Sequence, residues 1–103
     1  MTEEPVILIN AFEVPTEADT TFLDTWQKAC DLLSTQDGYL SAHLHRSLTP
    51  DADFRFVNIG RWASPHAFRA ATATSEFHEV SRMPYPFHAA LYTVVRQDTA
   101  LRS

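Results

Sequence analysis

The order of strand-like and helix-like segments constrains the fold of this chain more than any other feature. Runs of β-branched and aromatic residues predict strands, and apolar residues spaced three or four positions apart predict helices. We expect strands over residues 5–13, 39–48, 54–62 and 88–96, and helices over residues 16–34, 65–73 and 75–81. The order β-α-β-β-α-β predicts an α+β, ferredoxin-like sandwich. In this fold, two helical segments cover one face of a four-stranded antiparallel sheet.

Residues with turn and capping chemistry separate these segments. Asp37 and Gly38 break the chain before the second strand, and residues 49–53 (TPDAD) predict a hairpin between the second and third strands. Ser64 followed by Pro65 is typical of a helix start, with serine as the cap and proline in the first helical position. The expected caps of the other two helices are Thr16 or Asp19, and Ser75.

The first and last strands are apolar on both faces. Residues 6–12 read VILINAF and residues 90–95 read ALYTVV. A sheet that is covered on one side only should alternate more cleanly between apolar and polar residues. In a chain this short, the simplest cover for the second face is another copy of the same chain, so we expect a homodimer packed sheet against sheet.

The length of 103 residues predicts a single domain over residues 1–103, with its core between about residues 5 and 97. The formal net charge is −5 and the basic residues are scattered, which argues against nucleic acid and membrane as partners. A lone cysteine, Cys30, fits a reducing compartment, and the start MTEEP does not resemble a secretion signal. We therefore expect a cytoplasmic protein.

The third predicted strand carries two polar groups on one face. Asn58 and Trp62 lie an even number of residues apart, so they share a face with Phe54, Phe56 and Gly60. An amide and an indole N–H in an apolar row are costly unless something binds them. One interpretation is a pocket in which both groups donate to an oxygen of an aromatic ligand. The other is that Trp62 anchors the core and Asn58 satisfies a backbone group.

Three further polar residues are candidates for the same pocket. Asn10 interrupts the apolar first strand beside Phe12, and it either lines the pocket or pairs with a neighbouring strand or the dimer mate. His78 on the short last helix is either a base beside the pocket or a surface residue. His88 starts the last strand next to the loop that holds Tyr85, so it could border the pocket.

Several kinds of site are not predicted. With two glycines, the chain has no glycine-rich loop for a nucleotide or flavin. Cys30 falls on the apolar face of the first helix, which favours a core role over a nucleophile. His43 and His45 share a strand face, but no third ligand is evident, so we expect no metal site.

Five motifs spread over residues 6–96 resemble one known family, that of the antibiotic biosynthesis monooxygenases (ABM). They are INAFEVP, DGYL, VNIGRW, ASPHAF and ALYTVVR. The resemblance implies a dimeric α+β barrel. One branch of the family contains quinone-forming monooxygenases that oxidise anthrone-like phenols with O2 and use no metal or flavin. The resemblance implies that Asn58 and Trp62 hold the substrate oxygens, that Phe68 replaces a tyrosine, and that His78 falls near a pocket arginine.

A second branch of the family degrades haem. Asn10 matches an asparagine of that branch, but Ala71 falls where it has a tryptophan, and its haem-ligating histidine would fall near Val80 or Ser81. Haem degradation therefore ranks below quinone formation, and a polyketide cyclase or a non-catalytic binder of small ligands remains open. The leading hypothesis is a cofactor-independent monooxygenase with a small aromatic molecule and O2 as partners. Its expected catalytic residues are Asn58, Trp62 and His78, and its expected substrate-binding residues are Asn10, Phe12, Phe56, Phe68, Tyr85 and His88.

Overall fold

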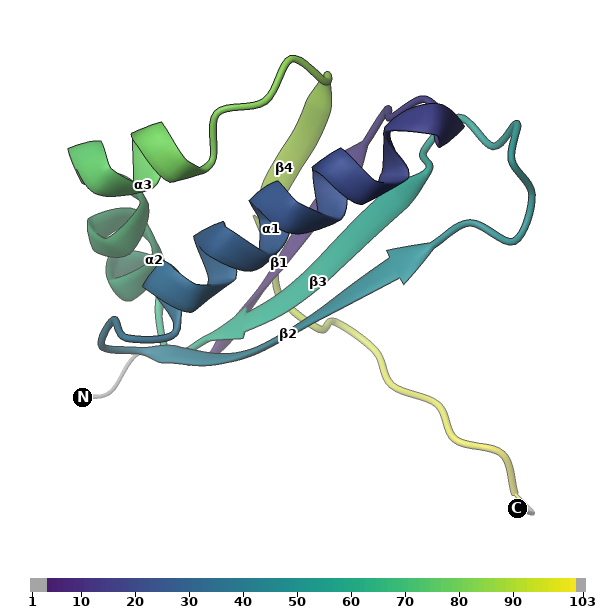
Figure 1. Cartoon of the computed structure of the whole chain (residues 1–103). Helices are drawn as coiled ribbons and strands as arrows, with labels where there is room; N and C mark the ends of the chain where they lie inside the picture. The colour runs from purple at the N-terminus through teal and green to yellow at the C-terminus, as the bar shows by residue number, and fades with distance from the viewer. Residues whose placement is uncertain (1–3, 102–103) are drawn as a thin grey trace.

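The computed structural model describes residues 4–101 and forms one four-stranded antiparallel sheet with helices on one face (Figure 1). The strand order is β2-β3-β1-β4. This arrangement confirms the predicted α+β, ferredoxin-like fold. The elements are β1 (Val6–Phe12), a 3-10 turn (Thr16–Ala18), α1 (Asp19–Leu33), β2 (Tyr39–Arg46), β3 (Phe56–Trp62), α2 (Pro65–Thr72), α3 (Ser75–Val80) and β4 (Phe87–Tyr92).

The register between the two central strands decides which side chains meet under the helices. Leu8 lies opposite Gly60, Asn10 opposite Asn58, and Phe12 opposite Phe56. Because side chains alternate along a strand, all the even-numbered residues of β1 and β3 point to the helical face. The predicted common face of Phe56, Asn58, Gly60 and Trp62 is therefore present, and all four residues are buried.

Aromatic contacts hold α1 against the sheet. Phe22 of α1 is completely buried; its ring stacks on Phe56 at 4.5 Å and meets Phe12 edge-on at 4.8 Å. Such aromatic pairs add to the free energy gained by burying their surface. A second buried cluster consists of Leu8, Leu33, Trp62 and Ala71 and lies under α2. The helical layer is thus fixed at two points on the sheet.

The start of α1 differs from the prediction. Asp19 does not cap the helix, since Ala18 takes the cap position without any side-chain hydrogen bond. The Asp19 carboxylate instead accepts hydrogen bonds from Nη2 and Nε of Arg55, at 2.7 and 3.2 Å. Arg55 also donates to the backbone carbonyl oxygen of Ser47 at 3.3 Å. Asp19 therefore ties the β2–β3 hairpin to the helical layer, and that ion pair replaces the expected cap.

The predicted cap of α2 is correct, and the predicted cap of α3 is wrong. Ser64 caps α2, because its Oγ accepts a hydrogen bond from the Ala67 N–H at 3.0 Å. The cap of α3 is Thr74 rather than Ser75, and its Oγ1 accepts from the Phe77 N–H at 3.1 Å. Serine and threonine cap similarly well, so two adjacent candidates cannot be separated by residue type.

The last strand is shorter than predicted. β4 ends at Tyr92, whereas the sequence predicts a strand as far as Arg96. Tyr92 pairs with Ile7, close to the beginning of β1, so β1 offers no backbone partner for the residues that follow. Val95 is 83% exposed, and the chain after β4 runs away from the sheet as an extended segment (Figure 1).

The sheet face opposite the helices has an apolar centre with polar side chains around it. The apolar residues are Ile7, Ile9, Ala11, Val57, Ile59, Ala90 and Tyr92, and the polar ones are Ser41, His43, His45, Arg61 and His88. Phe54 precedes β3 and packs edge-on against His88 at 5.4 Å, so it does not join the helical face with Phe56 as expected. Among the described helices, none has both the length and the apolar character that crossing a bilayer requires.

Candidate functional site

A cavity of about 280 Å³ opens between the sheet and α3. Its lining comes from β1, α3, the loop after α3 and the start of β4, and we call it the Asn10 cavity. The structure brings four of the predicted site residues together here, namely Asn10, Phe12, His78 and Tyr85. The remaining lining residues are Phe77, Ser81, Arg82, Met83 and Phe87. The walls thus combine aromatic rings with polar side chains in similar number.

One amide, that of Asn10, lines the Asn10 cavity, and the amide of Asn58 lies next to it on β3 without lining the cavity. Asn10 and Asn58 are direct cross-strand partners, and Asn58 is only 9% exposed. Within residues 4–101, the side-chain oxygen of each amide is buried and has no hydrogen-bond partner. A buried carbonyl without a partner costs about 1–3 kcal/mol. A ligand that donates hydrogen bonds at this point would remove that cost.

Either amide can also serve as a donor. Rotating the terminal amide by half a turn exchanges its oxygen for an NH2 group. The pair can therefore accept a hydrogen bond from a ligand hydroxyl, or donate one to a ligand oxygen that carries negative charge. The sequence predicted this chemistry for Asn58 and Trp62, whereas in the structure Asn10 is the amide that lines the cavity and Asn58 lies beside it.

Three polar side chains border the Asn10 cavity away from the amides. His78 is exposed on α3, and Arg82 follows in the turn after that helix. Within residues 4–101, Arg82 forms no ion pair. Sequence reasoning missed Arg82, although its position four residues after His78 is the spacing of neighbours on a helix face. His78 and Tyr85 can exchange a proton with a bound ligand, and the guanidinium of Arg82, which keeps its charge, can bind an anionic group.

Trp62 and Phe56 belong to the core and do not line the Asn10 cavity. Trp62 is 1% exposed and packs edge-on against Tyr39 at 5.3 Å and Phe68 at 5.5 Å. Phe56 is stacked beneath α1 on Phe22. In this structure, Trp62 is part of the core on the helical face of the sheet, as in the core-anchor interpretation, and a direct contact with ligand would require movement of its neighbours.

His88 lies on the opposite face of the sheet from the Asn10 cavity. It pairs with Ala11, an odd-numbered residue of β1, and therefore points away from the helices. Its Nε2 lies 2.8 Å from Oε2 of Glu13. The structure thus separates His88 from the other candidate residues, even though it is next to Phe87, which lines the cavity.

A second recess continues along the same strands. It has a volume of about 360 Å³ and lies between β4 and α2; we call it the β4 groove. Its lining residues are Leu8, Phe68, Arg69, Ala89, Ala90 and Leu91. Phe68, predicted to bind substrate, therefore lies in this groove rather than in the Asn10 cavity.

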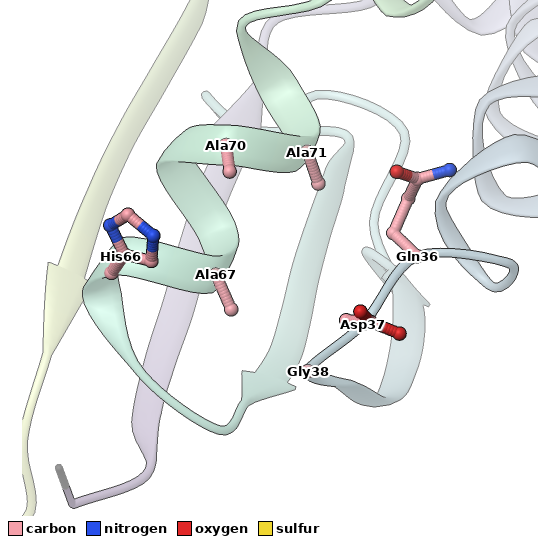
Figure 2. A pocket seen from close by; sticks show the side chains of 7 residues that line it. All are labelled: Gln36, Asp37, Gly38, His66, Ala67, Ala70 and Ala71. Atoms are coloured by element: carbon pink, nitrogen blue, oxygen red, sulfur yellow. The ribbon is translucent and has the colours of Figure 1, made fainter.

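A third and wider recess, of about 490 Å³, lies between α2 and the loop that leads into β2 (Figure 2). Figure 2 shows Ala67 and Ala71 pointing toward the loop with Gln36 and Asp37, while His66 lies on the other side of the helix. None of the predicted site residues lines this recess. Its mainly alanine wall offers little for recognition, so it is not the candidate site.

The groups with shifted pKa values lie outside both the Asn10 cavity and the β4 groove. Burial raises the pKa of the Cys30 thiol, which is hydrogen-bonded to the Tyr39 side chain, and burial likewise raises the Tyr39 pKa. Hydrogen bonding to Arg55 lowers the pKa of Asp19. Within the described chain, no group of three or more His, Cys, Asp or Glu side chains is arranged to hold a metal ion.

Comparison with known proteins connects this architecture to one family. Residues 5–83 match the model of the family described as "Antibiotic biosynthesis monooxygenase". No curated relative matches the chain. A candidate monooxygenase from Shewanella loihica PV-4 is 31% identical, with a TM-score of 0.83 and coverage of 94% of this chain and 99% of that one.

Two further solved structures show how varied the fold's activities are. SnoaB from Streptomyces nogalater, a cofactor-independent oxygenase, is 27% identical, with a TM-score of 0.78 and coverage of 97% of this chain and 99% of that one. A heme-degrading protein from Mycobacterium tuberculosis is 21% identical, with a TM-score of 0.65 and coverage of 95% and 99%. At this lower identity, the likeness to the heme-degrading protein concerns the fold alone.

Proposed function

Because this chain belongs to the antibiotic biosynthesis monooxygenase family, we propose that it is a cofactor-independent monooxygenase that converts a phenolic, anthrone-like aromatic into a quinone. The observation that carries the proposal is the buried side-chain oxygen of Asn10, which lines the cavity and has no hydrogen-bond partner within residues 4–101; the oxygen of its cross-strand neighbour Asn58 is in the same state. The likeness to SnoaB, whose name describes an oxygenase without a cofactor, supports the same reaction class.

In this proposal the residues in and around the cavity have two roles: some pack against the rings of the substrate, and others bind its polar groups. Phe12, Phe77 and Phe87 present apolar surface to the rings of the substrate. Asn10 binds an oxygen substituent and, with its cross-strand neighbour Asn58, stabilises the ionised phenol once the proton has left. His78 at the border accepts that proton. Trp62 acts through packing, because it holds β3 against Tyr39 and Phe68.

The reaction balances without an added reductant. The substrate methylene loses two hydrogens, one oxygen atom of O2 becomes the new carbonyl, and the other leaves as water. The electrons come from the ionised, electron-rich substrate itself. The task of the protein is then to favour that ionised form and to keep bulk water away from it.

Oxygen uptake with 1,8-dihydroxyanthrone tests the proposal, with the quinone identified by mass spectrometry. We expect catalysed uptake and a strong loss of rate in the Asn10→Ala and Asn58→Ala variants. Conversion under anaerobic conditions would indicate a cyclase, and binding without conversion would indicate a ligand-binding protein. A haemin titration with reductant covers the haem-degrading alternative, since loss of a stoichiometric Soret band under air would overturn the proposal.

We also propose that the protein is a homodimer joined through the apolar sheet face, working in the cytoplasm, where Cys30 stays reduced. Ile7, Ile9 and Ile59 lie in the middle of that face, and the helices cover only the other one. The extended residues 93–96 (TVVR) leave the sheet at the edge of the same surface. Burying this surface against a second copy would remove apolar area from water.

A further inference from the structure

We propose that the sheet face opposite the helices, which we call the open sheet face, is a pH-sensitive contact between two copies of this chain. The copies join through it at neutral pH and separate in mild acid, when His43 and His45 take up protons. This switch rests on the homodimer proposed above and adds the condition under which the dimer forms.

Two histidines of β2 border the apolar centre of the open sheet face. His43 lies opposite Ile59 and His45 lies opposite Val57, and both histidines are exposed. Neighbouring strands are only about 4.8 Å apart, which is less than the reach of an imidazole side chain. A second copy that covers Ile59 would therefore also cover part of both imidazoles.

A positive charge on these imidazoles would have no carboxylate of the sheet to balance it. Within the described strands β1 to β4, no residue is an aspartate or a glutamate. Arg61 lies opposite Ser41 and is thus a diagonal neighbour of His43, at about 7–8 Å for this relationship. His43 and His45 are themselves about 7 Å apart along β2. Protonation would therefore gather like charges on one side of the face.

His88, on the other side of the open sheet face, differs because it has a counter-charge. Its Nε2 lies 2.8 Å from Oε2 of Glu13, and the two form an ion pair when His88 is protonated. Acid therefore adds an attraction within one copy at this point. Tyr92 lies on the same face, and a tyrosine hydroxyl is ordinarily neutral throughout this pH range. The switch is thus assigned to the two histidines of β2.

Charges at the two ends of the open sheet face favour a second copy as its cover. Arg61 lies opposite Ile7, near the start of β1, whereas Glu13 follows the end of β1. A copy turned end over end by a two-fold axis would bring each Arg61 toward the Glu13 end of the other copy. Glutamate and arginine ordinarily stay charged from neutral pH to mild acid, so this attraction changes little over the range in which histidines titrate.

Proton uptake and association oppose each other at the two histidines. An imidazolium covered by apolar surface loses its hydration without gaining a partner, so the dimer favours the neutral ring. Nδ1 of His45 donates to the Val57 carbonyl oxygen at 3.2 Å, which leaves Nε2 to accept the added proton. Separated copies bind protons as the pH falls below the ordinary histidine pKa of about 6.5. Association is therefore full above that pH and is lost below it.

Sedimentation velocity over a series of protein concentrations tests the switch at about pH 7.5 and about pH 5.5. At the lower pH only about one tenth of free histidines are neutral, so each histidine that must give up its proton weakens association about tenfold. Four such residues in a dimer set an upper limit of about 10,000-fold, and we expect a weakening of about 100-fold or more. Circular dichroism at both pH values verifies that the chain stays folded.

Two double variants isolate the charge of the β2 histidines. The variant with His43→Gln and His45→Gln keeps polar but neutral side chains, so it should be dimeric at both pH values. The variant with His43→Lys and His45→Lys carries fixed charges, so it should be monomeric at both. Both positions are exposed, so neither pair of changes disturbs the core. His66→Gln, at an exposed histidine of α2 in the helical layer, is the matched control and should still dissociate in acid.

The outcomes distinguish failure of the switch from failure of the proposed dimer. Dissociation of the unmodified protein in acid, retained in His66→Gln and absent from the glutamine variant, supports the switch. A dimer that is unchanged at pH 5.5, or a glutamine variant that dissociates as the unmodified protein does, overturns the switch and leaves the dimer standing. A lysine variant that stays dimeric would place both histidines outside the contact. A monomer at pH 7.5 overturns the dimer and the switch together, whereas oxygen uptake by that monomer would leave the proposed reaction standing.

Discussion

Asn10 and Asn58 lie opposite each other on the two central strands, and the side-chain oxygen of each is buried without a hydrogen-bond partner in the described chain. Proteins bury few such groups, because each one lowers the stability of the fold. Two of them side by side, one of which lines a cavity, suggest a site at which stability is given up for binding. That relationship leads to the first prediction.

Replacing Asn58 with leucine should change stability and activity in opposite directions. Removing an unpartnered buried amide is expected to stabilise the fold by about 1 kcal/mol, because the amide gains little in the free protein. Turnover should fall about 100-fold, because a preset group that stabilises the ionised substrate is lost. Urea unfolding and oxygen uptake measure the two effects. A destabilised Asn58→Leu protein would mean that the amide is satisfied within the free protein.

His78 should affect turnover, whereas another exposed histidine should not. His78→Gln removes the proton acceptor at the border of the Asn10 cavity and should lower kcat by a factor of about 100. His66→Gln is the matched control, since His66 is also exposed and lies at the start of α2, away from this cavity. Equal rates for the two variants would remove His78 from the mechanism.

The two glycines should respond differently to alanine. Gly38 has a φ of +88°, and a Cβ there would collide with the Cβ of Ala67, so Gly38→Ala should cost about 2 kcal/mol or more. At Gly60 the nearest atom to a new Cβ is the Ser41 carbonyl oxygen at 3.5 Å, an ordinary contact. Gly60→Ala should therefore change stability little. Chemical unfolding of both variants checks the pair, and a neutral Gly38→Ala would contradict the turn geometry.

Asp19 should make the fold more stable at neutral than at acidic pH. Hydrogen bonds from Arg55 lower the Asp19 pKa below its ordinary value of 3.8. A carboxylate with a lowered folded-state pKa contributes stability above its unfolded-state pKa, and the contribution is lost as pH falls through the folded-state value. Asp19→Asn should thus be less stable than the unmodified protein at pH 7, with the difference shrinking below about pH 4. A pH-independent difference would contradict a role for the charge.

The sequence predicted the fold well because its alternation is strong where one face is buried. In β3 the buried residues Phe56, Asn58, Gly60 and Trp62 alternate with more exposed ones, so both the strand and its inward face could be predicted. The same reasoning identified Asn10, because a single polar residue among apolar ones on an inward face is conspicuous.

The parts that sequence reasoning missed depend on register and on packing between elements. His88 was expected near the site, but β4 is apolar on both sides, so only its pairing with β1 decides that His88 points away. The burial of Trp62 follows from contacts with Tyr39 and Phe68, which come from two other elements. Arg82 follows the end of α3 at Val80, so its spacing of four residues from His78 could be recognised as a signal only once the helix bounds were known.

A charge in the middle of the open sheet face should prevent dimerisation. Ile9 lies between Ile59 and Ala90 on the face that we propose joins two copies. A lysine at position 9 would have to be desolvated in such an interface, which is unfavourable without a partner charge. Sedimentation velocity should show a dimer for the unmodified protein and a monomer for Ile9→Lys. Leu23→Lys, on the exposed side of α1, is the matched control and should remain dimeric. A monomeric unmodified protein would mean that there is no dimer. A dimer that persists in Ile9→Lys would mean that the interface lies elsewhere.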